Sequence, residues 1–176
     1  MNRYMRRALR GSFFNRPTIG VARELLGKYL VRRIGGREIA RQITEVEAYV
    51  GFQDKASHAS RGMTPRNKIM FGKAGVWYVY FTYGMHWMLN VVTGRKGYPA
   101  AILIRGVDGI SGPARLTKFF KIDKRFNGKS ASRKIGLWIE DRGVKIAKSQ
   151  IKRSVRIGVE YAGAWKSKLW RFYLLQ

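Results

Sequence analysis

The sequence contains no cysteine, only two histidines and only ten acidic residues in a chain of 176. Without cysteine the protein has no disulfide, no cysteine-ligated zinc, no iron–sulfur cluster and no cysteine nucleophile. His58 and His86 alone are too few for a multi-histidine metal site. No run of 18 apolar residues exists, and charges interrupt the N-terminus where a signal peptide would need an apolar stretch. We therefore expect a cytoplasmic protein without a membrane-spanning segment.

Positive charge, in contrast, is abundant. Lys and Arg number 36 against 10 Asp and Glu, which gives a formal net charge of +26. Self-repulsion of this size opposes folding, and a polyanionic partner is its usual reason. The basic residues are spread along the chain, whereas a membrane-surface binder concentrates them on one amphipathic helix or tail. The charge therefore favours a nucleic-acid partner held by salt-sensitive phosphate contacts, with improved solubility as the alternative reason.

Composition and length predict one folded domain. Apolar residues make up 45% of the chain and aromatic residues 13%, which is enough for a hydrophobic core. A length of 176 residues is typical of a single domain. We assign residues 1–12 to a basic N-terminal arm and residues 13–176 to the domain. A helical pattern begins at Pro17-Thr18, and its apolar face comprises Ile19, Ala22, Leu25, Leu26 and Tyr29.

The remaining patterns predict a sheet. Gly35-Gly36 indicates a two-residue hairpin turn between strands at 29–34 and 37–50. Further strands are expected at 76–81, 86–93, 100–105, 155–161 and 169–174. Residues 52–74 form a long polar loop, of a length that is usually functional. A helix begins at Pro113 and turns Leu116, Phe119 and Phe120 inward. We therefore predict an α+β fold, a single domain with a mainly antiparallel curved β-sheet and flanking helices.

Two of the ten acidic residues share one face of a predicted strand. Glu45, Glu47 and Tyr49 alternate along residues 37–50 and so point to the same side. Two close carboxylates raise each other's pKa, and an aromatic neighbour adds desolvation in the same direction. A glutamate in this setting could act as a general base near neutral pH. The alternative is a solvated strand face that pairs with nearby arginines, and the motif alone does not decide between the two.

Other side chains are typical of a pocket for a nucleic-acid base. His58 lies in the polar loop and is either a hydrogen-bond donor in a pocket or a surface histidine. Tyr83 lies at the tip of an aromatic hairpin, where turns normally carry small polar residues. It either folds back onto the core or inserts between stacked bases. Tyr49, Tyr78 and Tyr80 offer flat walls for a base taken out of the helix, with core packing as the alternative.

The segment Ser111-Gly112-Pro113 begins a helix whose free backbone N–H groups could hold a phosphate, with simple capping as the alternative. Several short motifs of the sequence, this segment among them, resemble the motifs of the alkyladenine (3-methyladenine) DNA glycosylase family. They follow one another from about Phe13 to Tyr173 and comprise Thr44-Glu45-Val46-Glu47-Ala48-Tyr49, Asp54 to His58, Thr64-Pro65-Arg66-Asn67, Tyr78-Val79-Tyr80, Tyr83-Gly84-Met85, Asn90, Ile102-Leu103-Ile104-Arg105, Ser111-Gly112-Pro113, Arg156-Ile157-Gly158-Val159 and Arg171-Phe172-Tyr173.

The resemblance implies a function. A monofunctional enzyme of this kind hydrolyses the bond between a damaged purine and deoxyribose and leaves an abasic site. The implied substrates are 3-methyladenine, 7-methylguanine, ethenoadenine and hypoxanthine in double-stranded DNA. The resemblance implies neither a metal nor an organic cofactor. We expect a monomer that is associated with the nucleoid and does not bind membranes.

The resemblance also implies roles for individual residues. Glu47 is the general base that activates water, and Arg105 helps to hold that water. Three rings, from Tyr49, His58 and Tyr80, enclose the flipped base. Asn90 completes the base pocket and excludes the exocyclic amine of normal guanine. Tyr83 fills the gap left in the duplex, and further DNA contacts are expected from Met85, Arg66, Ser111, Gly112 and Arg115.

Two features depart from the family pattern, and two other functions stay open. Only residues 106–110 separate Arg105 from Ser111, where many relatives have a longer insertion, and the net charge exceeds that expected of the family. A non-catalytic nucleic-acid-binding module would also explain the charge and the aromatic residues. A metal-dependent nuclease would use Glu45, Glu47 and Asp54 as oxygen ligands for Mg²⁺.

Overall fold

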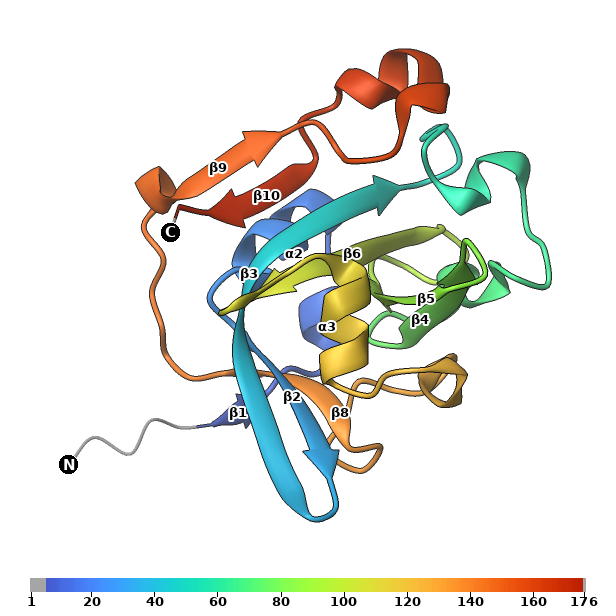
Figure 1. Cartoon of the computed structure of the whole chain (residues 1–176). Helices are drawn as coiled ribbons and strands as arrows, with labels where there is room; N and C mark the ends of the chain where they lie inside the picture. Colours follow the sequence, from blue (N-terminus) through green and yellow to red (C-terminus); the bar gives the residue numbers. More distant parts are fainter. Residues whose placement is uncertain (1–5, 176) are drawn as a thin grey trace.

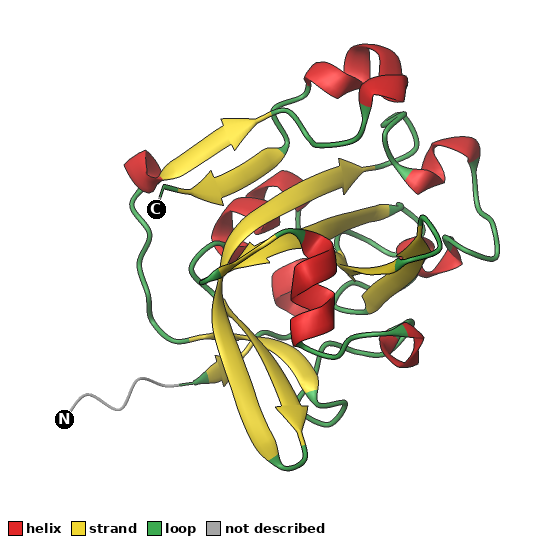
Figure 2. Cartoon of the chain, in the orientation of Figure 1, coloured by secondary structure: helices red, strands yellow, loops and turns green. Residues whose placement is uncertain are grey.

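A curved antiparallel sheet forms the centre of the protein, with helices packed against it (Figure 1, Figure 2). The computed structural model describes residues 6–175. The strands are β1 (Arg7–Ala8), β2 (Tyr29–Ile34), β3 (Arg37–Val50), β4 (Trp77–Thr82), β5 (His86–Val92), β6 (Ala100–Val107), β7 (Ile110–Ser111), β8 (Leu137–Asp141), β9 (Ile151–Ser154) and β10 (Arg171–Leu174). The α-helices are α1 (Gly11–Phe14), α2 (Thr18–Leu25) and α3 (Pro113–Phe119). Short 3-10 helices are η1 (His58–Arg61), η2 (Lys68–Phe71), η3 (Lys124–Phe126), η4 (Lys148–Gln150) and η5 (Glu160–Ser167). The predicted single-domain α+β fold is confirmed.

Within residues 6–175, no helix is both long and apolar enough to cross a membrane.

Strand β3 connects the two parts of the sheet. The hydrogen-bonded order is β1-β8-β2-β3-β6-β5-β4, and all of these pairs are antiparallel. The first half of β3 pairs with β2, and its second half pairs with β6 on one edge and with β10 on the other. Gly35 and Gly36 join β2 to β3 with φ angles of 55° and 78°, as the predicted two-residue turn requires. In Figure 1 this hairpin projects from the body of the molecule, and β3 continues from it across the sheet.

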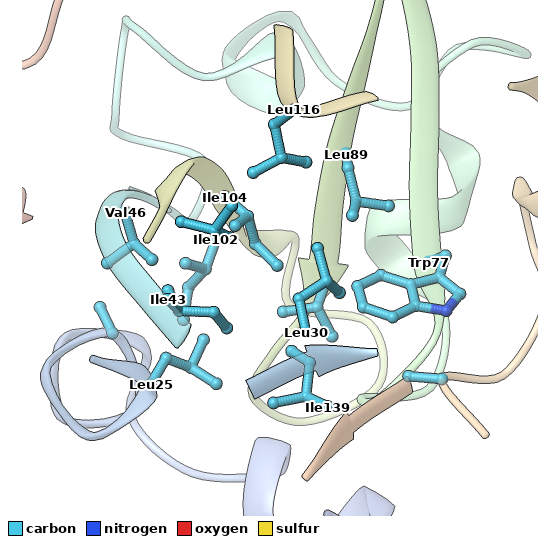
Figure 3. Close-up of a cluster of buried hydrophobic side chains, with 14 of the residues drawn as sticks. Leu25, Leu30, Ile43, Val46, Trp77, Leu89, Ile102, Ile104, Leu116 and Ile139 are labelled. Carbon is cyan, nitrogen blue, oxygen red and sulfur yellow. The ribbon is translucent and has the colours of Figure 1, made fainter. Parts of the chain in front are cut away.

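The hydrophobic core lies on one face of the sheet. Val46 of β3 and Ile104 of β6 pack with Leu25 of α2, and Leu89 of β5 packs near Leu116 of α3 (Figure 3). All five side chains are fully buried. Because successive strand residues point to opposite faces, the neighbours of these core residues lie on the other face. That second face carries the candidate site.

The helices differ from the predicted pattern in two places. Helix α2 ends at Leu25, because Gly27 adopts a φ of 85°, a left-handed conformation that commonly follows a helix. Tyr29 therefore does not extend the helical face and instead begins β2. Phe119 of α3, which was predicted to point inward, is 38% exposed. The Arg41 guanidinium lies 5.6 Å from the centre of its ring.

Two strand predictions also need correction. The expected strand at 155–161 does not form: β9 ends at Ser154, and the chain passes through a loop into η5. Arg156 and Val159 are both buried, a spacing of three that an alternating strand does not give. Strand β8 was not predicted, because its buried residues Leu137, Trp138 and Ile139 do not alternate with polar ones.

The N-terminal segment and the long loop are more structured than the sequence indicated. Residues 1–5 of the predicted basic arm lie outside the described residues. Arg7–Ala8 pair with β8, and Phe14 of α1 is buried in the core. The predicted loop 52–74 contains η1 and η2, and three of its polar residues, Asp54, Ser57 and Asn67, are buried.

Candidate active site

The register of four strands places several predicted site residues in one row. Glu47 of β3 pairs with Leu103 of β6, Leu103 pairs with Asn90 of β5, and Asn90 pairs with Tyr78 of β4. All four lie on the face opposite the core, because the residues that alternate with them belong to the core cluster. The same alternation adds Tyr49 of β3 and Tyr80 of β4 to this face.

A pocket of about 170 Å³ opens on this face of the sheet. Strands β3 to β6 form its floor, and η1 and the segment 157–161 form its sides. Its lining residues are Tyr49, Ala56, His58, Tyr78, Tyr80, Thr82, Tyr83, Met88, Asn90, Leu103, Arg105, Ile157, Gly158, Val159 and Tyr161. The structure thus brings together at one pocket Tyr49, His58, Tyr80, Tyr83, Asn90 and Arg105.

Glu47 lies directly behind this lining and is fully buried. The Tyr49 hydroxyl donates to its Oε2 at 2.9 Å, and the backbone N–H of Ile157 donates to its Oε1 at 2.8 Å. Nε of Arg105 lies 3.5 Å from the same Oε1. Burial raises the pKa of Glu47, and the positive charge of Arg105 and the two hydrogen bonds oppose that rise. The carboxyl is therefore one side chain away from the cavity and holds its proton more strongly than an exposed glutamate.

Glu45 has a different environment, although it shares a face with Glu47. Its Oε1 accepts hydrogen bonds from Nε of Arg105 at 3.0 Å and from Nε of Arg171 at 2.6 Å. For Glu45, the alternative interpretation from the sequence, an acid that pairs with nearby arginines, is correct. Repulsion between the two carboxylates contributes least among the causes that shift the pKa of Glu47. The predicted desolvation is therefore the main effect.

A β-bulge directs Arg105 toward both acids. Val46 pairs with Ile104, and Glu45 pairs with Gly106, so that Arg105 has no opposite residue on β3. A bulge bends the strand and redirects the side chain of the extra residue. In this protein the redirected guanidinium comes within hydrogen-bond distance of Glu45 and close to Glu47.

Neutral aromatic rings form one wall of the pocket. The His58 and Tyr80 ring centres are 4.6 Å apart, those of Tyr78 and Tyr80 are 5.2 Å apart, and Nδ1 of His58 lies 3.0 Å from the Tyr78 hydroxyl. His58 is exposed as a residue, but its ring is partly enclosed by these tyrosines. That partial burial, with the positive charge of Arg66, lowers the pKa of His58 to about 4. Burial raises the pKa of Tyr78 to about 12 and raises the pKa values of Tyr49 and Tyr80 as well.

The β4–β5 turn projects at the mouth of the pocket. Tyr83 is 80% exposed and adopts a φ of 51°, and Met85 is 67% exposed. Tyr83 therefore does not fold back onto the core. The Arg66 guanidinium lies 5.1 Å from the centre of the Tyr80 ring and donates to the carbonyl of Phe81 at 3.1 Å. This contact fixes a positive charge beside the projecting turn.

The start of α3 is placed beside this turn rather than in the pocket. Met85 and Arg115 line a shared surface hollow of about 500 Å³, and Arg115 is exposed. Ser111 lies in β7, and Gly112 precedes α3 with a φ of 100°. The structure thus groups Arg115 with Met85, whereas Ser111 and Gly112 are not among the pocket residues.

The three acids considered as ligands for Mg²⁺ do not converge. Asp54 is fully buried, and its two oxygens accept from Arg156 at 2.6 Å and 2.9 Å. Glu45 pairs with two arginines, while Glu47 accepts from a hydroxyl and a backbone N–H. Across residues 6–175, no three His, Asp or Glu side chains form a group that could hold a metal ion. The arrangement that the nuclease hypothesis predicted, with Glu45, Glu47 and Asp54 gathered around one Mg²⁺, is therefore wrong.

Sequence reasoning missed two contributors to the site. The Ile157 N–H is a backbone group and so carries no side-chain signal. Arg156 was part of a recognised motif but received no role, although it is 2% exposed and binds Asp54 next to Tyr49. A buried arginine needs an acidic partner. This requirement was the available signal for the pairing of Arg156 with Asp54.

Comparison with known proteins gives the family. A family model described as Methylpurine-DNA glycosylase (MPG) matches residues 12–176. The chain is 44% identical to a "Putative 3-methyladenine DNA glycosylase" of Methanocella arvoryzae, over 92% of this chain and 89% of that protein. It is 41% identical to a protein of the same name from Myxococcus xanthus, over 93% and 88% of the two chains. A third, from Legionella pneumophila (strain Paris), is 42% identical over 97% and 95%. The chain therefore belongs to the methylpurine-DNA glycosylase family.

Proposed function

We propose that the protein is a monofunctional DNA glycosylase that flips a damaged purine out of double-stranded DNA and removes it by hydrolysis. The observation that carries this proposal is the buried Glu47 behind a pocket lined by Tyr49, Tyr80 and His58. Glu47 accepts the proton of a water molecule, whose oxygen bonds to C1′ of the deoxyribose. The bond between C1′ and the purine nitrogen breaks, its electron pair leaves with the purine, and an abasic site remains. Arg105 holds the attacking water beside Glu47.

The pocket suits a flat, electron-poor ring better than an anion. Burial raises the pKa values of Tyr49, Tyr78 and Tyr80 further above physiological pH and lowers the pKa of His58 below it, so that the rings of this wall carry no charge. 3-Methyladenine and 7-methylguanine carry a positive ring charge and leave readily, so that positioning and electrostatics supply most of the catalysis. Hypoxanthine and ethenoadenine are neutral, so that the departing base must take up a proton from solvent, and we expect their removal to be slower.

Access to Glu47 requires a local displacement in the free protein. Each carboxylate oxygen has a second lone pair that can accept from a water molecule, but Tyr49, Arg105 and Ile157 close the way from the cavity. Of these, Ile157 lies in a loop and is 49% exposed. We expect binding of the flipped nucleotide to move the exposed side chain of Ile157 and admit one water, while the backbone N–H of Ile157 stays on Glu47.

The surface around the mouth holds the duplex in this proposal. Tyr83 enters the space left by the flipped nucleotide, and Asn90 excludes normal guanine. Met85 belongs to the turn, Arg66 and Arg115 lie near it, and Ser111 and Gly112 directly precede α3. These residues contact the DNA backbone and position the duplex. One chain carries every residue that the proposal uses, so that a monomer is sufficient.

A panel of duplexes tests the proposal. Each duplex carries a single 3-methyladenine, 7-methylguanine, ethenoadenine or hypoxanthine, and alkaline cleavage after incubation in a chelator reveals abasic sites. Release of these bases from wild-type reactions, and not from matched undamaged duplex, supports the glycosylase. Salt-dependent DNA binding without release of any damaged base would favour a non-catalytic binding module instead.

A further inference from the structure

A buried arginine joins the two segments that supply hydrogen bonds to Glu47. Arg156 is 2% exposed and lies in the loop between β9 and η5. Its Nη1 donates to Oδ2 of Asp54 at 2.6 Å and to the carbonyl of Ala48 at 2.9 Å. Its Nη2 donates to Oδ1 of Asp54 at 2.9 Å and to the carbonyl of Trp165 at 3.2 Å. Arg156 thus connects β3, the loop that follows it and η5.

The same guanidinium lies between two aromatic rings. Its carbon is 4.8 Å from the ring centre of Tyr49 and 5.1 Å from that of Trp170. Asp54 is held in turn by the backbone N–H groups of Val50 and Ala56, each at 3.1 Å. Contact with two aromatic rings and a bidentate ion pair together fix the position of an arginine more closely than either does alone.

Both hydrogen-bond donors of Glu47 depend on this position. Ile157 follows Arg156 directly in the chain, and its N–H donates to Oε1 of Glu47. Tyr49 stacks on the Arg156 guanidinium, and its hydroxyl donates to Oε2. We propose that Arg156, held in place by Asp54, is the positioning residue that aims the Ile157 amide and the Tyr49 hydroxyl at the Glu47 carboxyl. The catalytic meaning of this role rests on the proposed function, in which Glu47 is the base.

Stability alone is a poor reason for this arrangement. A buried ion pair gains little over well-packed apolar residues, because both charges lose their hydration. Nε of Arg156 is also buried without a hydrogen-bond partner among residues 6–175, which adds a further cost. The presence of an arginine here in spite of these costs is explained by its effect on the donors of the Glu47 carboxyl. The charged and titratable groups that face Glu47 are Glu45, Tyr49, Tyr80, Arg105 and Arg171.

Two substitutions separate position from charge. Arg156→Lys keeps the positive charge but cannot make the bidentate, stacked contact. Asp54→Asn keeps the shape but removes a negative charge, so that a purely electrostatic effect would lower the pKa of Glu47. Loss of the two donors would instead raise that pKa in both variants, because both donors stabilise the carboxylate. Arg153→Lys is the matched control, since Arg153 is exposed on β9 and pairs with Phe172 of the core face.

The experiment titrates the glutamate carboxyl carbons by ¹³C NMR in wild type and the three variants, with Glu47→Gln assigning the Glu47 signal. Single-turnover excision of hypoxanthine is followed from pH 5 to 9 on the same proteins, with circular dichroism as the check of folding. We expect the pKa of Glu47 to rise by about one unit in Arg156→Lys and in Asp54→Asn. The acidic side of the pH–rate profile should shift to higher pH by the same amount. The excision rate at neutral pH should fall about 10- to 100-fold. Arg153→Lys should match wild type in both measurements.

Folded variants with an unchanged Glu47 titration would overturn the positioning role, and so would a lowered pKa in Asp54→Asn. Loss of the fold in both variants would also overturn it, because the pair would then serve stability only. If wild-type protein excises nothing, the proposed function fails, but the carboxyl titration still decides whether Arg156 positions the donors of Glu47.

Discussion

Glu47 of β3 and Asn90 of β5 are joined through a single residue, Leu103 of β6, in one cross-strand row. Two strand spacings separate their backbones, which is about 10 Å. The sheet register therefore fixes the distance between the proposed base and the side chain proposed to select the substrate. Sheet pairing is stiffer than a loop, so that this distance varies little when a ligand binds.

Asn90→Ala should widen the pocket at the point where a guanine amine would clash. Nδ2 of Asn90 donates to the Tyr78 carbonyl at 3.2 Å, and this bond holds the amide in place. We expect faster excision of guanine-type bases relative to hypoxanthine and a free energy of unfolding lower by about 1–3 kcal/mol. Competition between the two substrates in one tube measures the ratio. An unchanged ratio in a folded variant would remove Asn90 from the selection of bases.

Tyr83→Gly should separate function from stability at the turn. A tyrosine with a φ of 51° carries a conformational cost that glycine avoids. Because the side chain is 80% exposed, we expect the free energy of unfolding to stay the same or rise by up to about 1 kcal/mol. Affinity for a lesion-containing duplex should fall about tenfold, since the gap in the stack is left empty. Denaturation curves and binding titrations on one preparation check both effects.

His58 should stay neutral across the working pH range. Its pKa is lowered to about 4, whereas the unfolded chain has the ordinary value of 6.5. The unfolded state therefore binds more protons between these values, so that the contribution of His58 to stability is present above pH 6.5 and is lost as the pH falls to 4. Histidine ring NMR should show one imidazole that resists protonation to about pH 4. Titration of both rings near 6.5 would contradict the enclosed position of His58.

Local patterns in the sequence were sufficient to predict the hairpin at residues 29–50 and the face of its second strand that carries Glu45, Glu47 and Tyr49. Alternation along 37–50 and the Gly35-Gly36 turn depend on near neighbours, and both are found in the structure. Strand β8 was not predicted because it is buried on both faces, and its continuous apolar run lacks the two-residue alternation that indicates a strand. The loop at 155–161 contains apolar residues that resemble a strand, but the buried Arg156 determines its path.

Long-range contacts account for what the sequence did not predict at the site. Arg156 and Asp54 are 102 residues apart, and no local pattern links them. The bulge at Arg105 depends on a mismatch between two strands rather than on either strand alone. The sequence therefore indicated the presence of an acid in a desolvated setting, but not the donors that surround it.

Arg66→Ala and Arg115→Ala should each weaken DNA binding without regard to base sequence. Both arginines are exposed near the projecting turn, where phosphate contacts are proposed. We expect the slope of log K against log salt concentration to fall by about one per substitution. Arg153→Ala, on the opposite face of the sheet, serves as control and should keep the wild-type slope. Equal slopes in all four proteins would place the duplex elsewhere.

Glu47→Gln should stabilise the fold at alkaline pH. The pKa of Glu47 is raised by burial above the ordinary value of 4.5, so that the ionised form opposes folding above the raised pKa. We expect a gain of about 0.5–2 kcal/mol at pH 8, as for other functional residues held against a stability cost. The gain should shrink as the pH falls through the raised pKa and disappear well below 4.5, where the carboxyl is neutral in both the folded and the unfolded state. In the exposed control Glu38→Gln the effect should be reversed and small, because Arg33 lowers the pKa of Glu38.

Single-turnover excision of hypoxanthine by wild type and by Glu47→Gln, at protein concentrations that saturate the duplex in both cases, tests whether Glu47 is the base. Saturation removes differences in binding, so that the rate reports only the steps that follow binding of the duplex. We expect the variant to bind the lesion duplex as wild type does and to excise hypoxanthine at least about a hundredfold more slowly. Excision by Glu47→Gln at the wild-type rate would contradict the assignment of Glu47 as the base.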